Sequence, residues 1–210
     1  METFKAWSRR ALQRWTLARV THDRPRYRRC VDLGCGPGDW SELFAPLCDE
    51  LYACDVSDVF VDQARARTAA HPLRQIERAD LRAYAVPRGL DLAYLGAVLL
   101  YMSDADARDV LRRVRASAAP GAHVIIREYC TFNLGRRAER SSSGYSVHRR
   151  PRDVLALAEH AGLHLIEARS SPSIYAEVIG GPILGWPLRL GWRLGTLHWT
   201  RASHTFRFRA

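Results

Sequence analysis

Apolar and polar positions follow two alternating periods along most of the chain. Short apolar runs, typical of buried strands, are each followed by a stretch in which apolar residues recur every three or four positions, as on one face of a helix. The runs predict strands at residues 27–33, 51–54, 73–78, 90–95, 122–127, 163–168 and 204–208.

The helices predicted between these strands have recognisable start signals. Ser57 and Ser103 are suitable N-caps for helices that begin at the next residue. Further helices are expected over residues 151–161, from residue 39 onward, and in the N-terminal segment 1–26, where an amphipathic helix would cover the site. Because parallel strands need crossover connections of this length, the alternation predicts an α/β fold with a doubly wound, Rossmann-like, mainly parallel sheet. We expect one domain across all 210 residues.

Two segments interrupt this rhythm. Residues 131–150 follow the fifth strand, are rich in Arg and Ser, and predict a loop or insertion. Residues 176–202 precede the last strand and contain Trp and Leu that alternate with Pro, Arg and Gly. This alternation fits a strand, but Pro187 and the four-residue spacing of Leu190 and Leu194 favour a helix. The helix either packs in the core or contacts a membrane surface, a lipid-linked substrate or a second copy of the chain.

The charge distribution separates the middle of the chain from its ends. The net charge is +10, and it arises from residues 1–30 and 130–210, whereas residues 31–129 carry an excess of acidic side chains. Basic flanks suit an anionic partner: a phosphate, a carboxylate, nucleic acid or a membrane surface. They also fit a compositional bias, because Lys5 is the only lysine and arginine supplies every other basic side chain.

The sequence lacks the patterns of export, membrane insertion and metal binding. An uncharged apolar run of about 18 residues, which a membrane span requires, does not occur, and Arg and Trp interrupt the first 20 residues, unlike a signal peptide. The five cysteines form no C-x-x-C pair, which argues against a zinc site or a disulfide framework. We therefore expect a reduced, cytoplasmic protein without a metal.

The most informative motif is Val-Asp-Leu-Gly-Cys-Gly-Pro-Gly-Asp at residues 31–39. Gly34, Gly36 and Gly38 stand between a predicted strand and a predicted helix, an arrangement that brings backbone N–H groups close to a nucleotide-like ligand. A dinucleotide loop would carry a third glycine where Asp39 stands, so a nicotinamide-dependent dehydrogenase is disfavoured. Asp32 and Asp39 flank the loop and would repel a pyrophosphate, but they suit a ligand with an ammonium and a sulfonium group.

Acidic and small residues also end the next predicted strands. Asp55 follows the second strand, Asp80 the third, and Gly96 the apolar run of the fourth. Ligands bind outside the carboxyl ends of the strands in open parallel sheets. A carboxylate at Asp55 can accept hydrogen bonds from both hydroxyls of a ribose.

This ordered set of residues resembles the class I S-adenosylmethionine (SAM)-dependent methyltransferases, and residues 31–39 resemble their motif I. The resemblance covers residues 27–130 well and the remainder loosely. It implies a seven-stranded sheet with an antiparallel C-terminal strand, SAM as methyl donor with S-adenosylhomocysteine as product, and an Asp80 carboxylate at the adenine edge. The cofactor contacts that it implies are Asp32, Gly34, Gly36, Gly38, Asp55, Val56, Asp80, Leu81, Leu95 and Gly96.

Residues after the fourth and fifth strands are candidates for the acceptor side of the reaction. Tyr101 and Glu128 are expected to face the transferred methyl group, with Glu128 as general base or substrate anchor. An ion pair with Arg127 or with a loop arginine is the alternative for Glu128. His148 and Arg149 precede a predicted helix and are expected to reach over the pocket, Arg149 as a clamp for a carboxylate or phosphate. A surface position is the alternative for His148.

The expected function is transfer of a methyl group from SAM to an oxygen or nitrogen of a small molecule. Residues 145–163 are similar to bacterial small-molecule and sugar methyltransferases, and the basic flanks favour an anionic acceptor: a sugar, a natural product, or a carrier- or lipid-linked group. Methylation of exocyclic base amines is disfavoured, because Leu95-Gly96-Ala97-Val98 stands where those enzymes place Asn/Asp-Pro-Pro-aromatic. The alternatives are a non-catalytic SAM-fold module, or a methyltransferase of RNA or protein N-termini that uses the basic flanks.

Overall fold

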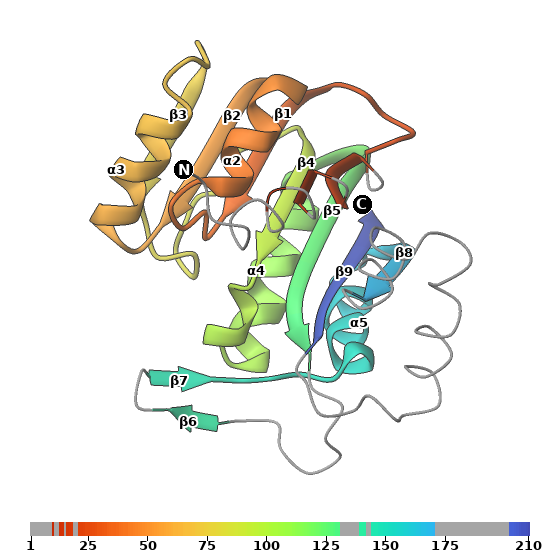
Figure 1. The fold of residues 1–210 in the computed structure, drawn as a ribbon. Helices are drawn as coiled ribbons and strands as arrows, with labels where there is room; N and C mark the ends of the chain where they lie inside the picture. The colour runs from red at the N-terminus through yellow and green to blue at the C-terminus, as the bar shows by residue number, and fades with distance from the viewer. Residues whose placement is uncertain are drawn as a thin grey trace, which may run out of the picture.

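In a computed structural model, the chain forms a seven-stranded mixed sheet with helices on both faces (Figure 1). The structure describes residues 10, 13–14, 16–18, 21–130, 139–141, 144–170 and 202–210. The strands of the sheet are β1 (Tyr27–Leu33), β2 (Cys48–Asp55), β3 (Arg74–Arg78), β4 (Leu90–Gly96), β5 (Ala118–Cys130), β8 (His164–Ser170) and β9 (Ala202–Arg209). Their order is β3-β2-β1-β4-β5-β9-β8, and β9 runs antiparallel to both of its neighbours, whereas the other pairs are parallel. The predicted fold class is confirmed.

Helices and short 3-10 turns connect the strands. They are α2 (Asp39–Phe44), η1 (Ala45–Leu47), α3 (Asp58–Arg67), η2 (Leu99–Tyr101), α4 (Asp104–Ser117) and α5 (Pro151–His160). The two predicted N-caps are confirmed, since the Ser57 hydroxyl accepts from the Phe60 N–H at 3.4 Å and the Ser103 hydroxyl from the Asp106 N–H at 3.1 Å. Each cap satisfies a backbone donor that the helix itself leaves free.

Helices cover the sheet on both sides. α4 and α5 pack on one face, where Val110 and Leu157 belong to the same buried apolar cluster. α2 and α3 pack on the opposite face, Phe44 against Tyr94 with ring centroids 5.2 Å apart, and Val61 over β2 and β3. Burial on both faces explains why the central strands consist of nearly continuous apolar runs.

The order of the strands reverses between β1 and β4. After β1 the chain adds β2 and β3 on one side, and then crosses to add β4 and β5 on the other. The connections on the two sides of β1 and β4 therefore leave in opposite directions, which opens a crevice at the carboxyl ends of these strands. This is the edge at which the glycine loop and the acidic strand ends lie.

The predicted elements differ from the observed ones mainly at strand ends. β2 begins at Cys48 rather than at residue 51, and β5 is longer than expected at both ends. The extension of β5 follows from its pairing, because Ala118 lies opposite Leu90 of β4 and Cys130 opposite Ala202 of β9. The antiparallel pairing of the last two strands, which the family resemblance implied, is confirmed.

The loop expected over residues 131–150 contains a short antiparallel hairpin, β6 (Glu139–Ser141) and β7 (Gly144–Ser146). Figure 1 shows this hairpin apart from the main sheet, beyond the end toward which β5 points. The helix expected within 176–202, with its membrane and dimer alternatives, lies outside the described residues.

The described part of the N-terminal segment is helical at residues 13–14 and 16–18. Leu17 joins the buried apolar cluster beneath α2. None of the helices that the structure describes has the length and apolar content needed to span a bilayer.

Candidate active site

The loop between β1 and α2 turns sharply at the crevice. Gly34, Gly36 and Gly38 have φ values of 74°, 53° and 86°, in the left-handed region that favours glycine. The Gly34 N–H donates to the carbonyl oxygen of Cys54 at 2.9 Å, which ties the loop to the end of β2. A side chain at Gly34 would place its Cβ 2.5 Å from Cγ2 of Val98, so the loop also lies directly against the segment after β4.

A cavity of about 490 Å³ opens at these strand ends, within the usual range for small-molecule sites. Its wall combines the glycine loop, the segments after β2, β3 and β4, the start of α3 and the turn η2. The lining residues are Gly34, Gly36, Cys54, Asp55, Val56, Ser57, Phe60, Ala79, Asp80, Leu81, Arg82, Gly96, Ala97, Val98, Tyr101 and Met102. Seven of the ten expected cofactor contacts thus share one cavity. Over the part of the chain that the structure describes, no group of three or more His, Cys, Asp and Glu side chains could hold a metal ion.

Backbone donors fix the side chain of Asp55, which lines the cavity. Its Oδ2 accepts from the Gly36 N–H at 2.9 Å, and its Oδ1 accepts from the Ser57 N–H at 3.0 Å. A carboxylate oxygen has two acceptor sites, so each oxygen keeps capacity for a further donor. The arrangement fits a ligand that presents two adjacent hydroxyls.

Asp80 carries an ion pair of its own. Arg82 Nε lies 3.0 Å from Asp80 Oδ1, Arg82 Nη2 lies 2.6 Å from Oδ2, and the Arg82 N–H also donates to Oδ1 at 2.9 Å. These hydrogen bonds hold the pKa of the Asp80 carboxyl below its ordinary value. The two side chains are 42% and 60% exposed. A ligand amine at Asp80 must therefore share the carboxylate with Arg82 or displace the guanidinium.

The segment after β4 forms another part of the cavity wall. Ala97 has a φ of 54°, which is uncommon for a residue other than glycine, and its N–H donates to the Arg127 carbonyl oxygen at 2.7 Å. Tyr101 is 67% exposed and lines the cavity together with Val98 and Met102. This wall is therefore apolar except for one phenol group.

Three expected cofactor residues are not among those lining the cavity. Leu95 is fully buried in the sheet. Gly38 lies where a Cβ would be 2.6 Å from Cα of Ala64, so it allows α2 and α3 to pack closely. Asp32 is 1% exposed, accepts from the Ser41 hydroxyl at 2.6 Å, and has its pKa raised to about 7 by burial. Contact of these three residues with a cofactor stays a prediction.

Of the four expected acceptor-side residues, Tyr101 lines the cavity. Glu128, His148 and Arg149 are each at most 9% exposed and are not among the lining residues. His148 is buried rather than at the surface, with Nδ1 3.5 Å from the carbonyl oxygen of Tyr129.

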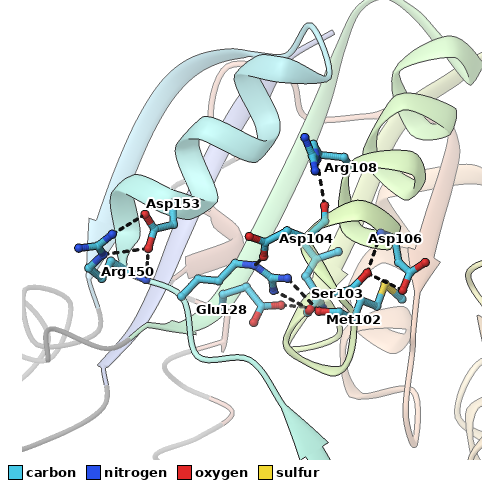
Figure 2. Close-up of polar contacts among 10 residues, drawn as sticks. Met102, Ser103, Asp104, Asp106, Arg108, Glu128, Arg150 and Asp153 are labelled. Atoms are coloured by element: carbon cyan, nitrogen blue, oxygen red, sulfur yellow. Dashed lines mark hydrogen bonds and ion pairs between the residues drawn. The ribbon is translucent and has the colours of Figure 1, made fainter. Parts of the chain in front are cut away.

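Glu128 and Arg149 form hydrogen bonds with protein backbone and are not among the residues that line the cavity. Figure 2 shows Glu128 near Met102. Glu128 Oε1 accepts from the Leu99 N–H at 2.9 Å. Arg149 donates from Nη1 to the Leu99 carbonyl at 2.7 Å, from Nη2 to the Met102 carbonyl at 2.9 Å, and from Nε to Asp104 Oδ1 at 2.9 Å. Burial raises the pKa of Glu128 to about 7, although the Leu99 N–H and the Arg149 charge act to lower it. In this arrangement neither side chain has the orientation expected of a base or a ligand clamp.

The sequence interpretation missed several residues of the cavity wall. Phe60 stands in the first turn of α3, is 42% exposed and lines the cavity. The available signal was an apolar side chain outside the buried face of this helix, which Val61 and Ala64 form. Val98 and Met102 follow β4 without any motif that marks them.

Comparison with known sequences agrees with this geometry. The sequence model of a family described as a methyltransferase domain matches residues 31–124, the span that holds the glycine loop, Asp55, Asp80 and Gly96. Over this span the chain is similar to SAM-dependent methyltransferases. Trans-aconitate 2-methyltransferase of Methylobacterium radiotolerans is 36% identical over 107 residues, which are 50% of this chain and 38% of that protein. The chain spans half or less of the length of the curated relatives that it matches.

Solved structures of a methyltransferase and of a cyclase share the fold of this chain. The N-methyltransferase NodS from Bradyrhizobium japonicum WM9, solved in complex with S-adenosyl-L-homocysteine, has a TM-score of 0.65 at 18% identity, over 94% of this chain and 85% of that one. The [4+2]-cyclase SpnF has a TM-score of 0.66 at 19% identity, over 93% and 80%. At these identities the likeness shows the methyltransferase fold alone.

Proposed function

We propose that the cavity binds SAM and that the chain transfers its methyl group to an oxygen or nitrogen of a small molecule. The observation that carries this proposal is the placement of two carboxylates, Asp55 and Asp80, in one cavity beside the glycine loop. Asp55, held by the N–H groups of Gly36 and Ser57, would bind the ribose hydroxyls. Asp80 would bind the exocyclic amine of adenine. The match of residues 31–124 to a methyltransferase-domain family supports this choice of ligand.

The chain's own contribution to such a reaction is alignment and exclusion of water. When bound, SAM supplies a methyl group to a lone pair of the acceptor as its C–S bond breaks, and S-adenosylhomocysteine and a proton are released. Holding the acceptor atom in line with the breaking C–S bond supplies much of the increase in reaction rate. The apolar side chains of Val98 and Met102 would keep water from the acceptor side.

The acceptor is proposed to bind at the wall formed by Val98, Tyr101 and Met102. An anionic acceptor was expected from the basic flanks, but the cation among the described lining residues is Arg82, which is already paired with Asp80. The exposed ring of Tyr101 offers a surface for an apolar or flat group. We therefore propose a small molecule with such a group next to its nucleophilic oxygen or nitrogen.

Calorimetric titration with S-adenosylhomocysteine tests the cofactor assignment. We expect binding to the wild-type chain and a loss of about tenfold or more in affinity in Asp55→Ala, because two hydroxyl contacts to a charged acceptor disappear. Asp62→Ala is the matched control, since Asp62 is an exposed acid on α3 that pairs with Arg65 away from the cavity. The assignment fails if the wild type does not bind, or if Asp55→Ala binds as well as Asp62→Ala.

A separate assay with methyl-labelled SAM tests transfer itself. Trans-aconitate is a suitable oxygen acceptor, because one relative is named for it, and simple primary amines test nitrogen acceptors. Label in the acceptor, with stoichiometric S-adenosylhomocysteine, would identify the acceptor atom.

A second candidate is a non-catalytic module that binds SAM. It deserves a test because SpnF, described as a cyclase, shares this fold. Binding of S-adenosylhomocysteine without label transfer to any acceptor would favour it. A methyltransferase of RNA or protein N-termini would instead show nucleic-acid or peptide binding through the basic flanks, in the first case with a steep dependence on salt. The reduced, cytoplasmic setting expected from the sequence stays a prediction.

A further inference from the structure

Two buried side chains, Glu128 and Arg149, hold the turn η2. The Glu128 carboxylate accepts from the N–H of Leu99, and the Arg149 guanidinium donates to the carbonyl oxygens of Leu99 and Met102. Glu128 is 4% exposed and Arg149 is 3% exposed, so these contacts form away from solvent. The hydrogen bonds of the Arg149 guanidinium are charge-assisted, and such bonds are stronger in buried surroundings than at a surface.

The two side chains come from separate parts of the fold. Glu128 lies near the end of β5, whereas Arg149 lies between β7 and α5. Arg149 also pairs with Asp104 at the start of α4, and the neighbouring Val147 N–H donates to the Leu100 carbonyl at 2.7 Å. Figure 2 shows Glu128, Met102 and Asp104 converging on this point. The backbone of η2 is thus fixed by two parts of the fold, the end of β5 and the segment between β7 and α5, and the side chains that hold it do not line the cavity.

The turn determines where two cavity residues lie. Tyr101 ends η2 and Met102 follows it, and both line the cavity. Tyr101 is 67% exposed, so side-chain packing alone does not hold it. Its position depends on the backbone to which it is attached.

We propose that Glu128 and Arg149 are positioning residues, which fix η2 so that Tyr101 and Met102 form the acceptor-side wall of the cavity. This inference rests on the proposed methyl transfer for its purpose, but the holding of the turn is measurable without it. It replaces two expected roles, Glu128 as a general base and Arg149 as a ligand clamp, with one structural arrangement. Neither residue touches the reacting atoms in it.

The choice of substitution at Glu128 separates a positioning role from a base. Glutamine keeps an oxygen that can accept from the Leu99 N–H but cannot take up a proton as a base at neutral pH. Leucine keeps most of the volume and leaves the Leu99 N–H without an acceptor. A positioning residue tolerates Glu128→Gln and not Glu128→Leu, whereas a general base tolerates neither.

Hydrogen exchange of the Leu99 amide and titration with S-adenosylhomocysteine are the two readouts. We expect exchange to rise about tenfold or more in Glu128→Leu and Arg149→Met, since opening of the turn loses a buried hydrogen bond. S-adenosylhomocysteine affinity should fall severalfold in the same variants. Glu128→Gln should stay within about twofold of wild type in both readouts. Arg150→Ala is the matched control, because Arg150 forms a neighbouring ion pair with Asp153 that does not reach η2.

Three outcomes would overturn the proposal. One is unchanged exchange at Leu99 in Glu128→Leu and Arg149→Met. Another is equal exchange in Glu128→Gln and Glu128→Leu. The third is a Glu128→Gln variant that binds S-adenosylhomocysteine normally but no longer transfers methyl groups, which would make Glu128 a base.

Two provisions keep the test decisive. If Glu128→Leu does not fold, Arg149→Lys replaces it, because a lysine keeps the charge but cannot bridge both carbonyl oxygens. A wild-type chain that fails to bind S-adenosylhomocysteine would refute the proposed function, whereas the exchange results would still report on the holding of the turn.

Discussion

Gly36 and Gly38 stand in the same loop, have the same sign of φ, and should respond very differently to substitution by alanine. A Cβ at Gly36, with φ 53°, would meet no atom within 4 Å. A Cβ at Gly38, with φ 86°, would lie 2.6 Å from Cα and 2.8 Å from Cβ of Ala64. The atoms of Ala64 belong to the α3 backbone and its first side-chain carbon, so they cannot rotate away.

The expected loss of stability follows from these contacts. An alanine in the left-handed region costs about 1–2 kcal/mol, which applies to both variants. Overpacking adds about 1–3 kcal/mol at Gly38 and nothing at Gly36. Gly38→Ala should therefore lower the unfolding free energy by about 2–5 kcal/mol, and Gly36→Ala by about 1–2 kcal/mol. For a chain of this length, the difference is on the order of 6 °C in Tm.

Urea denaturation followed by circular dichroism measures the two losses, and S-adenosylhomocysteine titration supplies the complementary readout. Gly36 lines the cavity and Gly38 does not. Gly36→Ala should therefore lower the affinity for S-adenosylhomocysteine, although it costs the fold little stability. Folded Gly38→Ala should bind nearly as well as wild type. Equal destabilisation by the two substitutions would refute the reasoning, since it would show that α3 moves away from α2 at little cost.

Three further predictions follow from other residues of the site. Burial raises the pKa of Asp32 and Glu128 to about 7 from ordinary values of 3.8 and 4.5. The folded chain therefore binds a proton at these two carboxyl groups more tightly than the unfolded chain does. The stability that this proton binding contributes should be lost as the pH rises from about 4 to 7. Asp32→Asn should flatten that fall in urea denaturation, and an unchanged slope would contradict it. Arg82→Ala should tighten S-adenosylhomocysteine binding by up to about fivefold in low salt, because it frees the Asp80 carboxylate from an exposed ion pair. Weaker binding of this variant in calorimetry would show that the Arg82 guanidinium contacts the ligand. Tyr101→Ala should change the unfolding free energy by less than about 0.5 kcal/mol, since the side chain is largely exposed. The rate of methyl transfer should fall in the same variant. A large loss of stability would show that the ring packs in the core.

The sheet could be predicted from the sequence because its signals are local. The apolar run of β4, the N-caps Ser57 and Ser103, and the spacing of Ala107 and Val110 in α4 each depend on neighbouring residues in the chain. The cofactor side of the site was accessible for the same reason. Its residues follow strand ends, and all parallel strands of one sheet place their carboxyl ends at one edge.

The roles of Glu128 and Arg149 could not be predicted in this way. Both were identified from position, since each stands where a chain segment returns to the carboxyl edge of the sheet. Their partners are backbone groups of Leu99 and Met102. In the sequence, Leu99 is 29 positions from Glu128 and 50 positions from Arg149. Backbone acceptors and donors are the same at every residue, so the sequence holds no complementary side chain that would reveal the pairing.

Gly38 is another residue whose role could not be predicted from the sequence. It belongs to the motif that suggested a ligand, yet its observed constraint is the distance to Ala64 on another helix. A motif identifies which positions require glycine, but whether a ligand or a packed helix imposes the requirement depends on the tertiary structure.

The fixed backbone of η2 has a consequence for altering acceptor choice by design. Since hydrogen bonds from β5 and from the segment before α5 hold this turn, insertions or deletions there would break contacts with several elements at once. The side chains of Tyr101 and Met102 project from that fixed backbone and can be exchanged individually. A combinatorial library confined to these two positions, with Glu128 and Arg149 retained, would sample different acceptor pockets on one unchanged cofactor site.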